Sequence, residues 1–166
     1  VSAHQGEIDW EAVADAGIDF AIIRLGYRGS TVGSIALDEY FEANIAGAAA
    51  AGIKVGIYFY SQAVSVEEAE EEADFILEHI AGYDVTYPIV YDWEIYESEN
   101  SRTAAIVDEA DLTSFAVAFC DKIAEAGYTP MIYFNTLIGY FYYDFNQISD
   151  YDLWLAEYNA AAPSFY

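Results

Sequence analysis

Residues 87–94 have the sequence YPIVYDWE, an apolar stretch that ends in two acidic residues. Its β-branched and aromatic content predicts a β-strand. Because successive side chains of a strand point to opposite faces, one face is wholly apolar and the other ends in Asp92 and Glu94. The apolar face is suited to packing on helices, and the other face becomes polar toward the carboxyl end of the strand.

Outward from this stretch, strand-like and helical patterns alternate along the chain. Further strands are predicted at residues 19–25, 54–60, 129–135 and 152–158, and helices at residues 10–16, 38–51, 66–80 and 110–126. Such alternation is typical of a parallel sheet covered by helices. Because the polar face lies at the carboxyl ends of the strands, the pattern favours a βα barrel, with an open doubly wound sheet as the alternative.

Local signals mark several helix ends. Ser65 with Glu68 three residues later predicts a capping box at the start of the third helix. The similar phrases AGIDF, AGIKV and AGYTP lead from a helix into the next strand, which places a glycine just after three of the predicted helices. These phrases indicate a repeated βα unit within one domain.

The composition bounds the possible functions. The chain has 166 residues, of which 55% are hydrophobic, so it suits one compact domain. It carries 29 Asp and Glu against 5 Lys and Arg, a net charge of −24. This charge repels nucleic acid and anionic membrane surfaces. No apolar run is long enough to cross a membrane, and the single cysteine, Cys120, excludes a disulfide scaffold.

Asp92 and Glu94 are the strongest candidates for chemistry. On a strand they lie about 7 Å apart and project to the same side. Two carboxylates held together should raise the pKa of at least one of them, and such pairs cleave glycosidic bonds. The plainer interpretation is that the two residues simply begin a polar loop.

Tyrosines near the ends of other predicted strands support a sugar site. The rings of Tyr58, Tyr60 and Tyr133 are suited to stacking on sugars and donating hydrogen bonds, although each alone is more often a core or rim residue. No zinc-ligand spacing, glycine-rich phosphate loop or serine nucleophile motif occurs. Arg24, at the end of a predicted strand, is as well explained by a structural ion pair.

Four blocks carry a family resemblance that runs through the whole chain. They are VSAHQGEIDWEAVADAGIDFAIIRLGYRGS (1–30), DEYFEANIAGAAAAGIKVGIYFYSQA (38–63), PIVYDWE (88–94) and LWLAEY (153–158). In this order they resemble the family 25 glycoside hydrolases, the Chalaropsis-type lysozymes. The resemblance implies a modified TIM-like βα barrel that cleaves the β-1,4 bond between N-acetylmuramic acid and N-acetylglucosamine in bacterial peptidoglycan. It implies no metal or organic cofactor.

The resemblance also assigns roles to residues. It implies that Glu94 is the general acid and that Asp92 stabilises an oxazolinium-like intermediate; a nucleophilic or water-activating Asp92 fits the same spacing. Tyr58, Tyr60 and Tyr133 match aromatic positions of the family's substrate groove. We expect a monomer that acts outside the cell or in the cell wall, although no signal peptide is visible.

The sequence departs from the family pattern at both ends. The Asp that precedes "VS" in the family is absent, and further barrel strands would follow "LWLAEY". We therefore expect residues 1–166 to be a single catalytic domain trimmed at both ends, lacking the first and last strands of the barrel. A non-catalytic glycan-binding barrel and a different carboxylate-based glycosidase remain as alternatives.

Overall fold

The computed structural model describes residues 1–96, 98–106, 111–158 and 161–162. Its strands are β1 (Phe20–Arg28), β2 (Ile35–Leu37), β3 (Lys54–Ser61), β4 (Val85–Trp93), β5 (Pro130–Asn135) and β6 (Asp152–Ala156). Its helices are a 3-10 turn at Ala3–Gln5, α1 (Trp10–Asp15), α2 (Phe41–Ala50), α3 (Val66–His79), α4 (Leu112–Glu125), α5 (Thr136–Phe141) and α6 (Phe145–Ile148).

The strands form one sheet in the order β2-β1-β3-β4-β5-β6. Neighbouring strands in the series β1-β3-β4-β5-β6 are parallel to each other. The short β2 pairs with β1 in the antiparallel direction. Over the described residues the sheet is open, with β2 and β6 at its edges. The mixed α/β class with a parallel sheet is confirmed, and all five predicted strands are present within a few residues of their expected ends.

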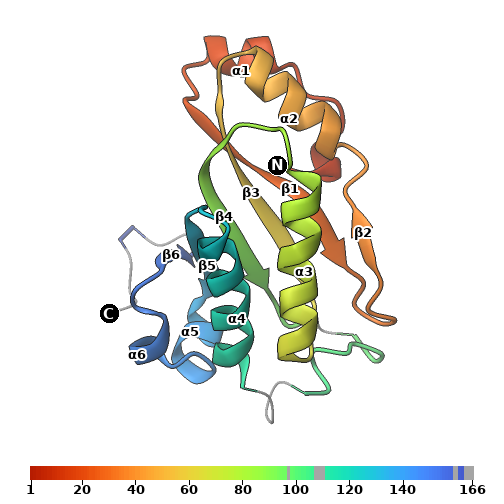
Figure 1. Ribbon diagram of the computed structural model, residues 1–166, viewed down its shortest axis with the longest axis vertical. Helices are drawn as coiled ribbons and strands as arrows, with labels where there is room; N and C mark the ends of the chain where they lie inside the picture. The colour runs from red at the N-terminus through yellow and green to blue at the C-terminus, as the bar shows by residue number, and fades with distance from the viewer. Residues whose placement is uncertain (97, 107–110, 159–160, 163–166) are drawn as a thin grey trace.

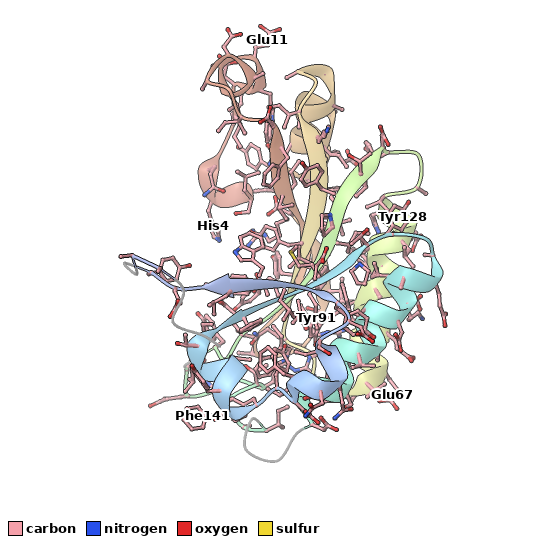
Figure 2. The ribbon with its side chains drawn as sticks, turned by 90° about the vertical axis from the view of Figure 1, so that its left-hand side faces the viewer. His4, Glu11, Glu67, Tyr91, Tyr128 and Phe141 are labelled. Carbon is pink, nitrogen blue, oxygen red and sulfur yellow. The ribbon has the colours of Figure 1, made fainter. Side chains whose placement is uncertain are left out.

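Helices cover one face of this sheet and bury its apolar side. Figure 1 shows α3 and α4 side by side in front of the strands, with α2 above them. Beneath these helices lie side chains from alternate strand positions, such as Ile57 of β3 and Tyr91 of β4, both fully buried. The Tyr91 ring centroid is 4.8 Å from that of Phe119 in α4. Figure 2 shows Tyr91 in the interior, whereas Glu67 and Phe141 lie at the periphery.

Side chains and glycines set the helix ends as predicted, with one correction. Gly17 and Gly127 follow α1 and α4 with φ of 82° and 89°, the left-handed conformation that glycine adopts most readily. Ser65 caps α3 by accepting a hydrogen bond from the Glu68 main-chain nitrogen. The carboxylate of Glu68 accepts from Val64 rather than from the N-cap residue, so the reciprocal half of the predicted capping box is displaced by one residue.

Four elements were not predicted, namely the 3-10 turn at Ala3–Gln5, β2, α5 and α6. Strand β2 has only 3 residues, too few for a visible alternation, and α5 and α6 are single short helices of 6 and 4 residues. The first residue of the predicted helix 110–126, Ala110, lies outside the described residues. These differences leave the arrangement of the parallel strands unchanged.

Candidate active site

A row of four side chains crosses the carboxyl end of the sheet on the face away from the helices. The strand register pairs Tyr60 with Asp92, Asp92 with Tyr133, and Tyr133 with Trp154. Partners in a parallel register project to the same face. The residues therefore form a continuous strip from β3 to β6, although the segments that contribute them lie far apart in the sequence.

A second row lies one step deeper, where the register pairs Arg24 with Tyr58 and Tyr58 with Val90. A cavity of about 200 Å³ lies between the two rows. It is lined by Val1, Ile22, Tyr58, Val90, Asp92, Tyr133 and Trp154. The structure thus places the predicted Asp92, Tyr58 and Tyr133 around one cavity. Tyr60 lines a second cavity of about 480 Å³ with His4 and Arg24, and the predicted Glu94 is not among the residues that line either one.

Asp92 is held in an environment that opposes its ionisation. One of its carboxylate oxygens, Oδ1, is fully buried and has no hydrogen-bond partner among the described residues. Burial and, to a smaller extent, the neighbouring Glu94 raise the pKa of Asp92 to about 8, and Arg24 opposes the change. A buried acceptor without a donor is costly, and its presence here indicates a place for a ligand donor.

Glu94 follows β4 directly and is partly buried. Burial raises the pKa of its carboxyl group, and a hydrogen bond with the Tyr133 side chain acts in the opposite direction. Because Glu94 and Asp92 act on each other electrostatically, ionisation of one makes ionisation of the other harder. The pair can therefore keep one proton at neutral pH, which is the condition for one acid and one carboxylate to work together.

The three predicted tyrosines share this environment. Burial and the charges of Asp92 and Glu94 raise the pKa of Tyr60 and of Tyr133, which keeps both hydroxyl groups protonated. Burial likewise raises the pKa of Tyr58. All three therefore remain hydrogen-bond donors over the ordinary pH range.

Sequence reasoning missed Trp154 as a site residue. Its ring lies against Tyr133 in an edge-to-face arrangement, with centroids 5.5 Å apart and an interplanar angle of 86°, and 42% of the side chain is exposed. A half-exposed indole that lines the same cavity as Asp92 is a surface on which a sugar ring can stack. Trp154 lies opposite Tyr133 only when the predicted strands 152–158 and 129–135 pair in one particular register. The sequence does not show this register.

The ion pair expected for Arg24 is present. Its guanidinium lies 2.7 Å from the Asp38 carboxylate, whose side chain is fully buried. Asp38 also accepts hydrogen bonds from the main-chain nitrogens of Ala3 and Tyr40. This pair ties the start of the chain to β1 next to the cavities, and Arg24 is the cation that acts on Asp92.

The buried carboxyl of Asp92 has a measurable cost. Folding raises its pKa from the ordinary 3.8 to about 8, so the folded form holds a proton that the unfolded chain releases. Its contribution to stability therefore falls as the pH rises from about 4 to about 8. We expect Asp92→Asn to stabilise the protein by about 1–3 kcal/mol at pH 8 and by little at pH 4. Urea unfolding of both proteins at the two pH values measures this difference, and an Asp92→Asn protein that is less stable at pH 8 would contradict it.

The described residues contain no cluster of three or more His, Cys, Asp and Glu side chains that could hold a metal ion. Within the same part of the chain, every helix is too short or too polar to cross a membrane.

Comparison with known proteins places the fold and the site in context. An autolytic lysozyme of Clostridium acetobutylicum is 25% identical over 161 residues, which are 96% of this chain and 44% of that protein. The modular autolysin LytC of Streptococcus pneumoniae, solved with a synthetic peptidoglycan ligand, superposes with a TM-score of 0.84 at 27% identity over 100% of this chain and 38% of its own. This chain thus spans less than half the length of either relative.

A family 25 glycosyl hydrolase of Bacillus anthracis shares the fold, with a TM-score of 0.72 at 22% identity over 96% of this chain and 69% of its own. The family model for glycosyl hydrolases family 25 matches residues 1–166. The chain therefore belongs to the glycosyl hydrolases of family 25.

Proposed function

We propose that this chain is the catalytic domain of an N-acetylmuramidase, which cleaves the β-1,4 bond between N-acetylmuramic acid and N-acetylglucosamine in peptidoglycan. The observation that carries the proposal is the pair Asp92 and Glu94, both with raised pKa values. Asp92 lines a cavity with aromatic walls, and Glu94 forms a hydrogen bond with Tyr133, which lines the same cavity. The family, the autolytic lysozyme relative and the peptidoglycan ligand of LytC support the choice of substrate.

Glu94 acts as the general acid in this proposal. Burial raises the pKa of its carboxyl group, which favours the protonated form that passes its proton to the glycosidic oxygen. The bond between this oxygen and the anomeric carbon then breaks, and the leaving sugar departs with the proton as a hydroxyl group. In the second step the Glu94 carboxylate removes a proton from the water that attacks the anomeric carbon, and the bond that the acetamido oxygen had formed with this carbon breaks. The acid and the acetamido group are both restored.

Asp92 stabilises the intermediate between the two steps. When the glycosidic bond breaks, the acetamido oxygen of the same sugar bonds to the anomeric carbon and forms an oxazolinium ring. The buried Oδ1 of Asp92 has no donor in the described protein, and the acetamido N–H of the substrate supplies one. The pair shares one proton, and the bond to this N–H together with the positive charge that develops on the group favours the arrangement in which Asp92 is ionised and Glu94 holds the proton.

Tyr58, Tyr60 and Tyr133 bind the glycan on either side of the two carboxyl groups, and Trp154 extends the aromatic wall. No cofactor takes part in this mechanism. The protein acts as a monomer on the cell wall, outside the cytoplasm.

The proposal is tested by incubating the protein with purified peptidoglycan and with chitin oligomers. We expect the protein to release reducing ends from peptidoglycan and far fewer from chitin. The proposed cleavage site lies between N-acetylmuramic acid and N-acetylglucosamine, and chitin contains no N-acetylmuramic acid. Sedimentation with the insoluble wall measures binding in parallel. Binding without release would identify a glycan-binding barrel, and preferential cleavage of chitin would identify a different glycosidase.

A further inference from the structure

The main chain of Glu94 is held by a buried amide side chain. Gln62 follows β3 and is fully buried, and its Nε2 donates hydrogen bonds to the carbonyl oxygens of Glu94 at 2.7 Å and Ser61 at 2.9 Å. Glu94 lies one residue beyond the end of β4, where the register with β3 stops at Trp93. Gln62 therefore continues the connection between the two strands after their ladder ends.

Thr103 completes the connection from the other side of Glu94. Its hydroxyl group donates to the Gln62 Oε1 at 3.1 Å and accepts from the Tyr96 main-chain nitrogen at 3.2 Å. Thr103 is fully buried, so water does not offer these groups other partners. One hydroxyl group thus fixes both the amide that holds residue 94 and the main chain at residue 96.

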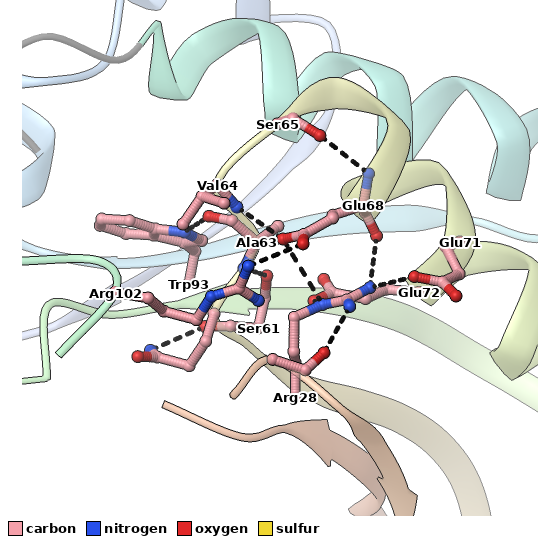
Figure 3. A network of polar contacts seen from close by, with 12 residues as sticks. Arg28, Ser61, Ala63, Val64, Ser65, Glu68, Glu71, Glu72, Trp93 and Arg102 are labelled. Carbon is pink, nitrogen blue, oxygen red and sulfur yellow. Dashed lines mark hydrogen bonds and ion pairs between the residues drawn. The ribbon is translucent and has the colours of Figure 1, made fainter. Parts of the chain in front are cut away.

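The segment that carries Thr103 is itself anchored to the rest of the fold. Arg102 donates from Nη2 to a Glu68 carboxylate oxygen at 2.7 Å, and its main-chain nitrogen donates to Ser30 at 2.9 Å. The other carboxylate oxygen of Glu68 accepts from the Val64 main-chain nitrogen at 2.9 Å. Figure 3 shows Arg102, Glu68 and Val64 within one network. Thr103 is therefore tied to α3 and to the turn after β1.

We propose that Gln62 and Thr103 are positioning residues, which hold the main chain of Glu94 so that its carboxyl group meets the leaving oxygen. This inference rests on the proposed role of Glu94. A general acid must lie within about 2.6–3.2 Å of its proton acceptor, and a misplacement of about 1 Å can lower the rate by about 100-fold. Glu94 lies beyond the last paired residue of β4, so the hydrogen bonds of Gln62 and Thr103 take the place of strand pairing in holding its main chain in position.

The test uses three variants. Thr103→Val keeps the shape of the side chain and removes its hydroxyl group, whereas Thr103→Ser keeps the hydroxyl. Thr113→Val is the matched control, because the Thr113 hydroxyl is also buried, accepts from the Asp144 nitrogen at 2.9 Å and donates to the Tyr142 carbonyl oxygen at 3.5 Å. It removes the same kind of hydroxyl group from a site that makes no contact with Glu94.

We expect Thr103→Val to lower kcat for peptidoglycan by about 10- to 100-fold with KM within about twofold, whereas Thr103→Ser and Thr113→Val stay near wild type. A carbon-13 NMR titration of the Glu94 carboxyl group gives a second readout. In Thr103→Val the pKa of Glu94 should fall toward its ordinary value, because a loosened main chain admits water; in the other two variants it should not change.

Two results would overturn the positioning role. One is a Thr103→Val protein with the kcat and the Glu94 pKa of wild type, and the other is an equal loss in Thr113→Val. If the wild-type protein releases no reducing ends, the proposed function fails, but the Glu94 titration still decides whether Thr103 controls the setting of that carboxyl group. The two failures are therefore distinguishable.

Discussion

Glu94→Gln is expected to lower the release of reducing ends from peptidoglycan by between about 100- and 10,000-fold while the fold stays intact. The amide has nearly the shape of the carboxyl group but carries no transferable acidic proton. The hydrogen bond from Gln62 to the main-chain carbonyl oxygen at this position does not depend on the side chain, so the local structure should persist. Initial rates and a urea unfolding curve measure the two halves of this prediction.

Glu42→Gln is the control for this substitution. Glu42 is exposed on α2 and lines neither of the two cavities, so the variant should retain wild-type activity. A Glu94→Gln protein that keeps more than about a tenth of the wild-type rate would remove Glu94 from the role of general acid. Loss of the unfolding transition would show that Glu94 is instead needed for folding.

Arg28→Met should cause the largest loss of stability of any change predicted here, about 3–5 kcal/mol. Arg28 is 3% exposed, and its guanidinium Nε lies 2.7 Å from a carboxylate oxygen of Glu72, which is fully buried in α3 (Figure 3). The guanidinium also donates to Glu71 and to the main-chain oxygens of Gly33 and Glu68. Without Arg28 the Glu72 carboxyl group is left buried with no counter-ion.

The pH dependence of this loss has a definite sign. Burial raises the pKa of Glu72 to about 7 even though Arg28 acts in the opposite direction. Removing Arg28 raises this pKa further, so the folded variant must hold a proton over a wider pH range than wild type does. We therefore expect Arg28→Met to lose more stability at pH 8 than at pH 5.

Two comparisons isolate the buried pair. Lys122→Met breaks an exposed ion pair with Asp74, with N and O atoms 2.6 Å apart and side chains 30% and 60% exposed, and should cost at most about 1 kcal/mol. The double variant Arg28→Met with Glu72→Met should recover much of the stability that Arg28→Met loses. Equal losses in Arg28→Met and Lys122→Met, measured by urea unfolding, would contradict the account.

The sequence was sufficient to predict the features that depend on local patterns. Alternation in residues 87–94 correctly separated Tyr91, which is buried beneath the helices, from Val90 and Asp92, which line the cavity. The glycines after α1 and α4 correctly marked helix ends, because a left-handed residue at that point is a local requirement. The acidic pair was visible for the same reason, since both of its members lie on one strand.

Features that depend on distant segments were not predictable in this way. The hydrogen bond between Thr103 and Gln62 joins residues 41 positions apart, and neither residue belongs to a local pattern. The contact between Tyr133 and Trp154 depends on the register of β5 with β6, which packing of the whole sheet sets. The antiparallel β2 is too short to show alternation. The first two of these features depend on contacts between segments that are distant in the sequence, and local sequence patterns do not reveal such contacts.

The central claim is that the protein cleaves the glycan after N-acetylmuramic acid. The most direct test is to identify the sugar at the new reducing end of the digested glycan. Peptidoglycan digested by the protein is reduced with borohydride and hydrolysed, and the reduced amino sugars are then separated. Cleavage by Glu94 and Asp92 at the proposed bond predicts reduced muramic acid, formed in proportion to the ends released and absent from the Glu94→Gln digest. Reduced glucosamine, or no reduced sugar from a wall to which the protein binds, would contradict the assignment.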